Sequence, residues 1–137
     1  MSITATVERL VPAPRERVWR ALTTDELALW FWPPRYQTVV ESELRVGGGY
    51  RIDGPGAGMA VSGVYVAVEE PSRLVQTWRW DGEADETLVT FTLADAPDGG
   101  TLLTIAHENF ADAVARDDHA IGWEACLDRL PRVLQLS

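Results

Sequence analysis

The sequence predicts an α+β domain in which a curved antiparallel sheet of about seven strands wraps a long C-terminal helix, with two short helices after the first strand. Between residues 36 and 108, apolar and polar residues alternate, and glycine-containing turns separate the runs. From Trp123 to Leu134 the apolar residues instead recur at helical spacing. The length of 137 residues suits a single domain over residues 1–137.

The first elements are one strand and two short helices. Residues 3–10 alternate in polarity and predict a strand, and residues 15–22 carry one apolar side and predict a helix. Thr23 and Glu26 have the spacing of a capping box. We therefore expect a second short helix over residues 27–30.

Six further strands complete the predicted sheet. We expect them over residues 36–42, 49–53, 60–69, 73–80, 86–95 and 101–108. The run Gly47-Gly48-Gly49 has neither the lysine nor the hydroxyl residue of a phosphate-binding loop, and it leads into a strand. It therefore predicts a turn.

The last segment predicts a long amphipathic helix that packs on the sheet. Its apolar stripe consists of Trp123, Cys126, Leu127, Leu130, Val133 and Leu134. Asp117 and Asp118 lie near its expected start, and Arg129 lies near its end, as the helix dipole favours. Pro131 lacks the amide that would bond to residue 127, which predicts a kink or a loosened last turn.

Composition excludes several classes of function. The net charge is −9, and all 12 basic residues are arginines scattered along the chain, so we expect no nucleic-acid partner. The absence of lysine excludes a Schiff-base amine. No apolar run reaches the roughly 18 residues of a membrane span, so we expect no membrane insertion. One cysteine excludes an internal disulfide and favours the cytoplasm.

Tryptophan is the most informative residue type in the chain. Trp78 and Trp80 flank Arg79 on a predicted strand, so both indoles share a face with Leu74 and Gln76. Six tryptophans in so small a domain indicate either a bulky core or the wall of a cavity for an apolar ligand.

Seven short runs, in a characteristic order, cover nearly the whole chain. They are PAPRERVWRALT (12–23), WFWP (30–33), LRVGG (44–48), GVY (63–65), LVQTWRW (74–80), GTLLTIAH (100–107) and GW (122–123). In these runs the chain resembles the START-like (SRPBCC) superfamily, and within it the branch similar to the C-terminal domain of the heat-shock protein 90 ATPase activator. The resemblance implies the helix-grip fold, also called Bet v-like, and a link to the stress response. The superfamily includes lipid carriers, polyketide cyclases and chaperone cofactors, so the fold alone does not choose among them.

The candidate ligand-binding residues are mostly aromatic and lie on predicted inward faces. They are Trp30, Trp32, Tyr50, Tyr65, Gln76, Trp78, Trp80, Phe91, His107 and Trp123. His107 shares its strand face with apolar residues, where an imidazole can bond a ligand, act as an acid or base, or serve as a structural histidine bonded within the protein. The histidines and neighbouring carboxylates lack zinc-site spacing, so we expect no metal and no cofactor.

Three functions fit this pattern. The first is non-enzymatic binding of a hydrophobic small molecule, lipid-like, aromatic or polyketide-like, between the sheet and the C-terminal helix. The second is a protein-interaction module that acts on a chaperone or another protein. The third is an enzyme of the cyclase or hydrolase type that uses His107. No catalytic residue is assigned, because no serine lies in a nucleophile-elbow context and Cys126 lies on the buried stripe.

Overall fold

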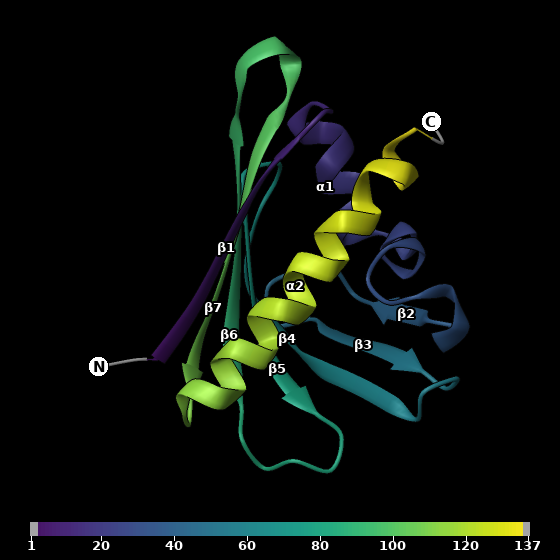
Figure 1. Cartoon of the computed structure of the whole chain (residues 1–137), viewed down its shortest axis with the longest axis vertical. Helices are drawn as coiled ribbons and strands as arrows, with labels where there is room; N and C mark the ends of the chain where they lie inside the picture. The colour runs from purple at the N-terminus through teal and green to yellow at the C-terminus, as the bar shows by residue number, and fades with distance from the viewer. Residues whose placement is uncertain (1–2, 136–137) are drawn as a thin grey trace.

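The computed structural model describes residues 3–135, and its main layer is a seven-stranded antiparallel sheet in the order β1-β7-β6-β5-β4-β3-β2 (Figure 1). The strands are β1 (Ile3–Val11), β2 (Val39–Ser42), β3 (Gly49–Gly54), β4 (Met59–Glu69), β5 (Arg73–Trp80), β6 (Thr87–Asp95) and β7 (Thr101–Phe110). All neighbouring pairs are antiparallel. The predicted helix-grip architecture is confirmed.

Helices cover the concave side of this sheet. They are α1 (Arg15–Thr23), the 3₁₀ turns η1 (Asp25–Leu29) and η2 (Pro34–Tyr36), and α2 (Ala113–Leu134), whereas a third 3₁₀ turn, η3 (Pro97–Gly99), lies in the connection between β6 and β7. The long helix α2 crosses the sheet diagonally, and its C-terminal end approaches α1 (Figure 1). No helix in residues 3–135 combines the length and the apolar character needed to cross a membrane.

The core lies between α2 and the inward face of the central strands. Leu103 and Ile105 of β7 and Leu127 and Leu130 of α2 are fully buried there. Around Trp78 the alternation of β5 follows the prediction, because Trp78 is buried whereas Thr77 is half-buried and Arg79 is exposed. Packing of the apolar stripe of α2 onto this face provides most of the driving force for the helix.

A glycine in β4 allows the sheet to bend. The pairing of β4 with β5 shifts register between Tyr65 and Ala67, as a β-bulge does. Close to this shift, a Cβ on Gly63 would lie 2.1 Å from the carbonyl oxygen of Thr77. Because any side chain there would collide with backbone, Gly63 is needed for the close approach of the two strands.

One detail of the short helices differs from the prediction. The second helix is the 3₁₀ turn η1, and its N-cap is Thr24, whose hydroxyl accepts from the Glu26 amide at 3.2 Å. The Thr23 hydroxyl instead donates to a carbonyl one turn back in α1. The predicted capping box with Thr23 is therefore wrong, and the Glu26 carboxylate pairs with Arg17.

Helix α2 also begins earlier than the acidic pair suggested. Its first residue is Ala113, and the Asp112 carboxylate accepts from the Ala115 amide at 2.8 Å as the N-cap. The helix runs through Pro131 to Leu134.

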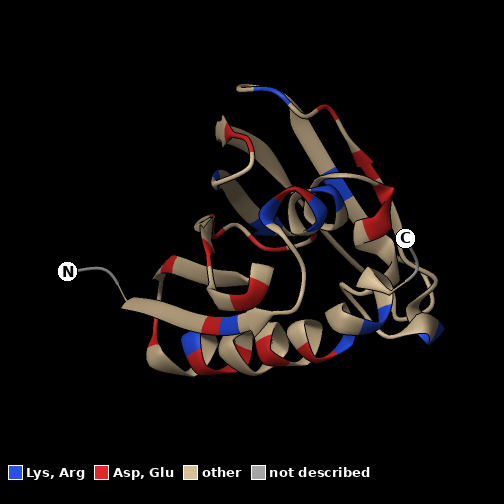
Figure 2. Cartoon of the chain, turned by 90° about the horizontal axis from the view of Figure 1, so that it is seen from above, with Lys and Arg blue, Asp and Glu red and all other residues tan. Residues whose placement is uncertain are grey.

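Charged side chains attach the outer surface of α2 to the edge strand β1. Arg9 of β1 reaches Asp128 at 2.9 Å and Glu124 at 3.5 Å. Seen from above, basic residues lie toward both ends of the helix and acidic residues lie between them, beside β1 (Figure 2). Exposed ion pairs of this kind each contribute up to about 1 kcal/mol, so burial of the stripe outweighs them.

Replacing Asp112 by alanine should lower the free energy of unfolding by about 1 kcal/mol, because the Ala115 amide loses its partner. Urea denaturation followed by circular dichroism measures the change. The matched control is Asp118→Ala, an exposed aspartate further along the same helix that has no ion pair among the described residues. Equal stability of the two variants would contradict the capping role.

Candidate functional site

A cleft of about 370 Å³, open to solvent, lies between α2, the segment around η2 and the ends of β4 and β5. Its lining is predominantly apolar and aromatic. The residues are Phe31, Trp32, Pro33, Tyr36, Met59, Trp78, Trp80, Asp118, His119, Gly122, Trp123, Ala125, Cys126 and Arg129. Small-molecule sites in proteins are typically concave and apolar with a few polar groups, as this cleft is.

Stacked and tilted rings form the walls of the cleft. Trp32 and Trp80 stack with ring centroids 6.1 Å apart and an interplanar angle of 20°. Trp78 packs against Trp123 at 5.2 Å and against Phe31 at 5.8 Å. These contacts hold the rings rigidly, so the cleft does not depend on loose side chains for its shape.

Hydrogen bonds from α2 hold the segment that carries Trp32 and Phe31. The Arg129 guanidinium donates from Nε to the Trp30 carbonyl at 3.0 Å and from Nη2 to the Phe31 carbonyl at 2.8 Å. The Cys126 thiol also bonds the Phe31 carbonyl, at 2.7 Å. The carbonyls of this irregular segment thereby have hydrogen-bond partners on the helix. The segment that carries Phe31 and Trp32 is fixed in this way, and it forms the roof of the cleft.

Gly122 lies in the middle of α2 and lines the cleft. A Cβ at this position would meet no atom within 4 Å. An interior helical glycine costs roughly 1 kcal/mol relative to alanine, and packing does not require one here. Gly122 instead leaves the helix backbone uncovered at the floor of the cleft.

The buried Nε1 of Trp78 has no hydrogen-bond partner in the structure. The Trp78 side chain is only 2% exposed, and it lines the cleft. A buried donor without a partner costs about 1 to 3 kcal/mol. A water or a ligand acceptor that reached this group would recover that free energy.

His107 is fully buried, and protein groups occupy both of its ring nitrogens. Nδ1 accepts from the Trp123 indole at 3.1 Å, and Nε2 lies 2.7 Å from the Thr87 hydroxyl. These partners imply a neutral ring with its proton on Nε2. Burial, with a smaller contribution from His119, lowers the pKa of His107 from 6.5 to about 3. This geometry favours the structural role for His107 and leaves no ring nitrogen for a ligand.

His119 forms a second indole-to-imidazole bond at the edge of the cleft. The Trp80 Nε1 donates to His119 Nε2 at 2.9 Å, and His119 Nδ1 lies 2.7 Å from the Ala115 carbonyl. The partners again imply a neutral ring, here with its proton on Nδ1. Trp80 is thereby fixed to α2.

The deeper space between sheet and helix is almost filled. A cavity of about 10 Å³ remains there, which is room for one water at most. The Tyr50 hydroxyl beside it donates to the Thr77 carbonyl, and the Tyr65 ring lies 5.5 Å from that of Tyr50. Burial raises the pKa values of both phenols. This part of the domain is packed core.

The structure separates the ten candidate residues into three groups. Trp32, Trp78, Trp80 and Trp123 line the cleft. Trp30, Tyr50, Tyr65, Gln76 and Phe91 line only the small deep cavity. His107 lines neither.

Several residues of the cleft were not among the sequence candidates. Gly122 and Arg129 are the most informative of these. The sequence signal that could have pointed to Gly122 was a glycine in the middle of the predicted helix. Cys126 lines the cleft too, but it is 4% exposed, and burial raises its pKa to about 12, so a thiolate is disfavoured. Within residues 3–135, no group of three or more metal-ligating side chains converges.

A family model identifies the family of the chain. The model of activator of Hsp90 ATPase homolog 1-like proteins matches residues 12–135. The chain belongs to this family. The resemblance seen in the sequence runs is thus confirmed. Among curated proteins, none matches significantly.

Solved structures agree with the helix-grip fold. A Chromobacterium violaceum protein shares 29% identity with the chain at a TM-score of 0.80, over 96% of both chains. DynU16, a protein of the dynemicin biosynthetic locus, shares 25% identity at a TM-score of 0.80, over 96% of this chain and 47% of its own. An Hsp90 activator from Plasmodium falciparum, 21% identical over 98% of this chain and 96% of its own, has a TM-score of 0.75 and shows the fold alone.

His107 should make stability depend on pH below neutrality. The unfolded chain binds a proton near pH 6.5, whereas the folded chain does so only near pH 3, so stability falls as the pH drops through this window. Relative to His107→Gln, the wild type should lose about 2 kcal/mol between pH 7 and pH 5. Urea denaturation of both proteins at each pH measures this difference, and parallel stability profiles would contradict the buried neutral imidazole.

Proposed function

We propose that this protein binds a hydrophobic small molecule in the tryptophan-walled cleft and does not transform it chemically. The observation that carries the proposal is the combination of four indoles with a bare helical glycine around an open space of about 370 Å³. A packed core would have filled this space, because voids between large side chains are costly. Membership of a family whose fold accommodates ligands supports the proposal.

The size of the cleft favours a compact ligand. Sites for small molecules typically span about 300 to 1,000 Å³, and this cleft is near the lower end. Two or three fused rings suit it better than a long acyl chain. Apolar burial at about 25 cal/mol per Å² supplies the driving force. Of the ligands considered from the sequence, the aromatic or polyketide-like classes are therefore preferred over the lipid-like class.

The chemistry of the cleft supports binding without turnover. The imidazole of His107 is held within the protein, and the buried Cys126 thiol resists ionisation. Among ionised groups, the ligand would meet only the Asp118 carboxylate and the Arg129 guanidinium. We place the protein in the cytoplasm, because one buried cysteine requires no oxidising compartment.

Filling the floor of the cleft should weaken binding without unfolding the protein. Gly122→Phe places a ring in the open space above the helix, so affinity for the neutral fluorescent probe N-phenyl-1-naphthylamine should fall more than about tenfold, the equivalent of 1.4 kcal/mol. Gly122→Ala should raise stability by about 1 kcal/mol, because it removes the entropic cost of a helical glycine. Fluorescence titration and thermal unfolding measure the two effects.

The matched control is Ile121→Phe, which adds the same ring at the neighbouring position, 70% exposed and outside the cleft. This variant should bind the probe as the wild type does. If Gly122→Phe and Ile121→Phe both retain wild-type affinity, the probe binds elsewhere and the proposed site fails. If the wild type itself does not bind the probe at all, the binding function fails.

A second candidate function is that of a chaperone cofactor, and the family match over residues 12–135 favours it. A cofactor should change the rate of ATP hydrolysis by purified Hsp90 of the same host in a dose-dependent manner. Gly122→Phe should leave this effect intact if the partner binds outside the cleft. An unchanged ATPase rate at saturating protein would rule the candidate out.

A further inference from the structure

Arg129 differs from the other arginines in its surroundings. Most arginines in residues 3–135 pair with a carboxylate, and the three without an ion pair are Arg35, Arg129 and Arg132. Arg35 and Arg132 are exposed to water, whereas Arg129 is half-buried and lines the cleft. In a chain of net charge −9, a cation without an anion inside an aromatic cleft is conspicuous.

The hydrogen bonds of Arg129 leave part of its guanidinium free. Nε and Nη2 donate to carbonyls of the roof segment, and Nη1 has no partner among the described residues. The two carbonyls hold the plane of the guanidinium in place. Nη2 also lies 3.8 Å from the Cys126 sulfur, so the N–H groups of Nη1 remain as preorganised donors, which suits a carboxylate.

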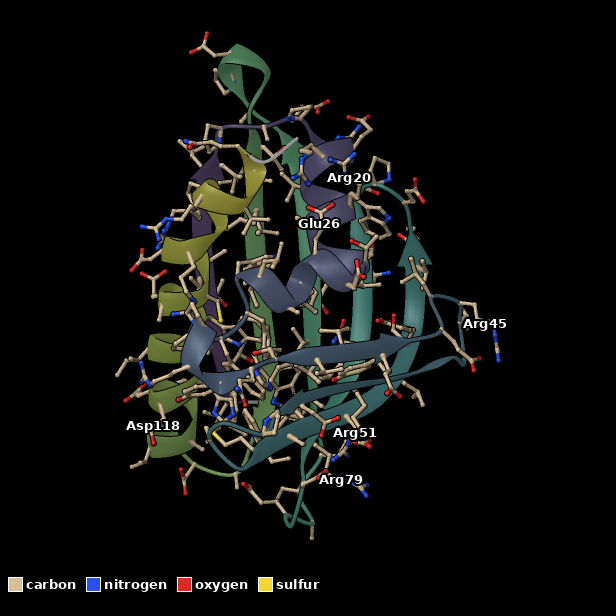
Figure 3. All side chains as sticks on the ribbon, turned by 90° about the vertical axis from the view of Figure 1, so that its right-hand side faces the viewer. Arg20, Glu26, Arg45, Arg51, Arg79 and Asp118 are labelled. Atoms are coloured by element: carbon tan, nitrogen blue, oxygen red, sulfur yellow. The ribbon has the colours of Figure 1, made fainter. Side chains whose placement is uncertain are left out.

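Asp118 and Arg129 give the two ends of the cleft opposite charges. Asp118 lines the cleft eleven residues before Arg129 on α2, which corresponds to about 16 Å along the helix. Figure 3 places Asp118 near the N-terminal end of α2. An anionic group is repelled at the Asp118 end and attracted at the Arg129 end, while the rings of Trp78 and Trp123 occupy the space between.

Trp78 provides a second hydrogen-bond donor that lacks an acceptor. Its indole Nε1 is buried and unpartnered, and its side chain lines the same cleft. A purely hydrocarbon ligand would leave this donor unsatisfied. An acceptor oxygen of a ligand would give this donor a partner, and a carboxylate would do the same for Nη1 of Arg129.

We infer that the cleft selects planar aromatic acids, with the fused rings lying between the indoles and the carboxylate bound by Arg129. Trp78 Nε1 donates to an acceptor atom of the same ligand. The inference rests on the proposed function, because it assigns a chemical class to the ligand of that cleft. Neutral aromatics of the same shape bind by ring burial alone, and aromatic amines are disfavoured at the Arg129 end.

Three naphthalene probes of matched shape test this selectivity. Naphthalene-2-carboxylate should bind about tenfold tighter than naphthalene-2-carboxamide, and 2-naphthylmethylammonium should bind most weakly. Calorimetry or quenching of the intrinsic tryptophan fluorescence gives the dissociation constants. In Arg129→Gln the ratio of carboxylate to carboxamide affinity should fall to about one, and a ratio within one variant does not depend on its folded fraction.

If Arg129→Gln does not fold, Asp118→Asn tests the same polarity at an exposed position. It should weaken binding of the ammonium probe several-fold and leave the carboxamide unchanged. Equal affinity of the wild type for carboxylate and carboxamide would overturn the selectivity while leaving the proposed function intact. Failure of all three probes, together with N-phenyl-1-naphthylamine, would overturn both.

Discussion

A buried chain of hydrogen bonds between α2 and the sheet determines the position of the helix. The Trp123 indole donates to His107, His107 donates to Thr87, and the Thr87 hydroxyl bonds the Trp78 carbonyl at 3.3 Å. A neutral imidazole has one donor and one acceptor, so a shift of the helix along the sheet would leave buried polar groups unpaired. Hydrophobic burial attaches α2 to the sheet, and this chain fixes where along the sheet it lies.

The position of α2 in turn decides what its neighbouring residues face. With Trp123 turned into the domain, Cys126 and Arg129 follow on the side that meets the segment after η1, and both bond its carbonyls. Gly122 lies beside the same segment at the floor of the cleft. Arg129 thus bonds the roof segment and also lines the cleft.

The sequence predicted the architecture well because its signals were local and repeated. Alternation marked the strands within a few residues, and the stripe from Trp123 to Leu134 marked α2. The N-cap of η1 was assigned to Thr23 when the structure uses Thr24, because neighbouring threonines offer the same side chain to the same turn. Local patterns do not distinguish between such alternatives.

The site was predicted only in part, for a reason of three-dimensional packing. Inward faces were assigned correctly, but the periodicity of a strand does not show whether inward side chains meet or leave a gap. Tyr50 and Tyr65 meet and fill the interior, whereas Trp32 and Trp80 border open space. From the sequence, Arg129 was recognised only as a charge near the end of the helix. Its contact with the roof joins residues about a hundred positions apart, which local patterns do not show.

The two indoles that line both spaces form a partition. Together with Phe31, Trp78 and Trp123 line both the outer cleft and the small deep cavity, so these three side chains lie between the two spaces. Smaller side chains at these positions would extend the cleft toward Tyr50, which lines the deep cavity. The depth of the cleft, and with it the length of a ligand that fits, therefore depends on the size of a few core side chains.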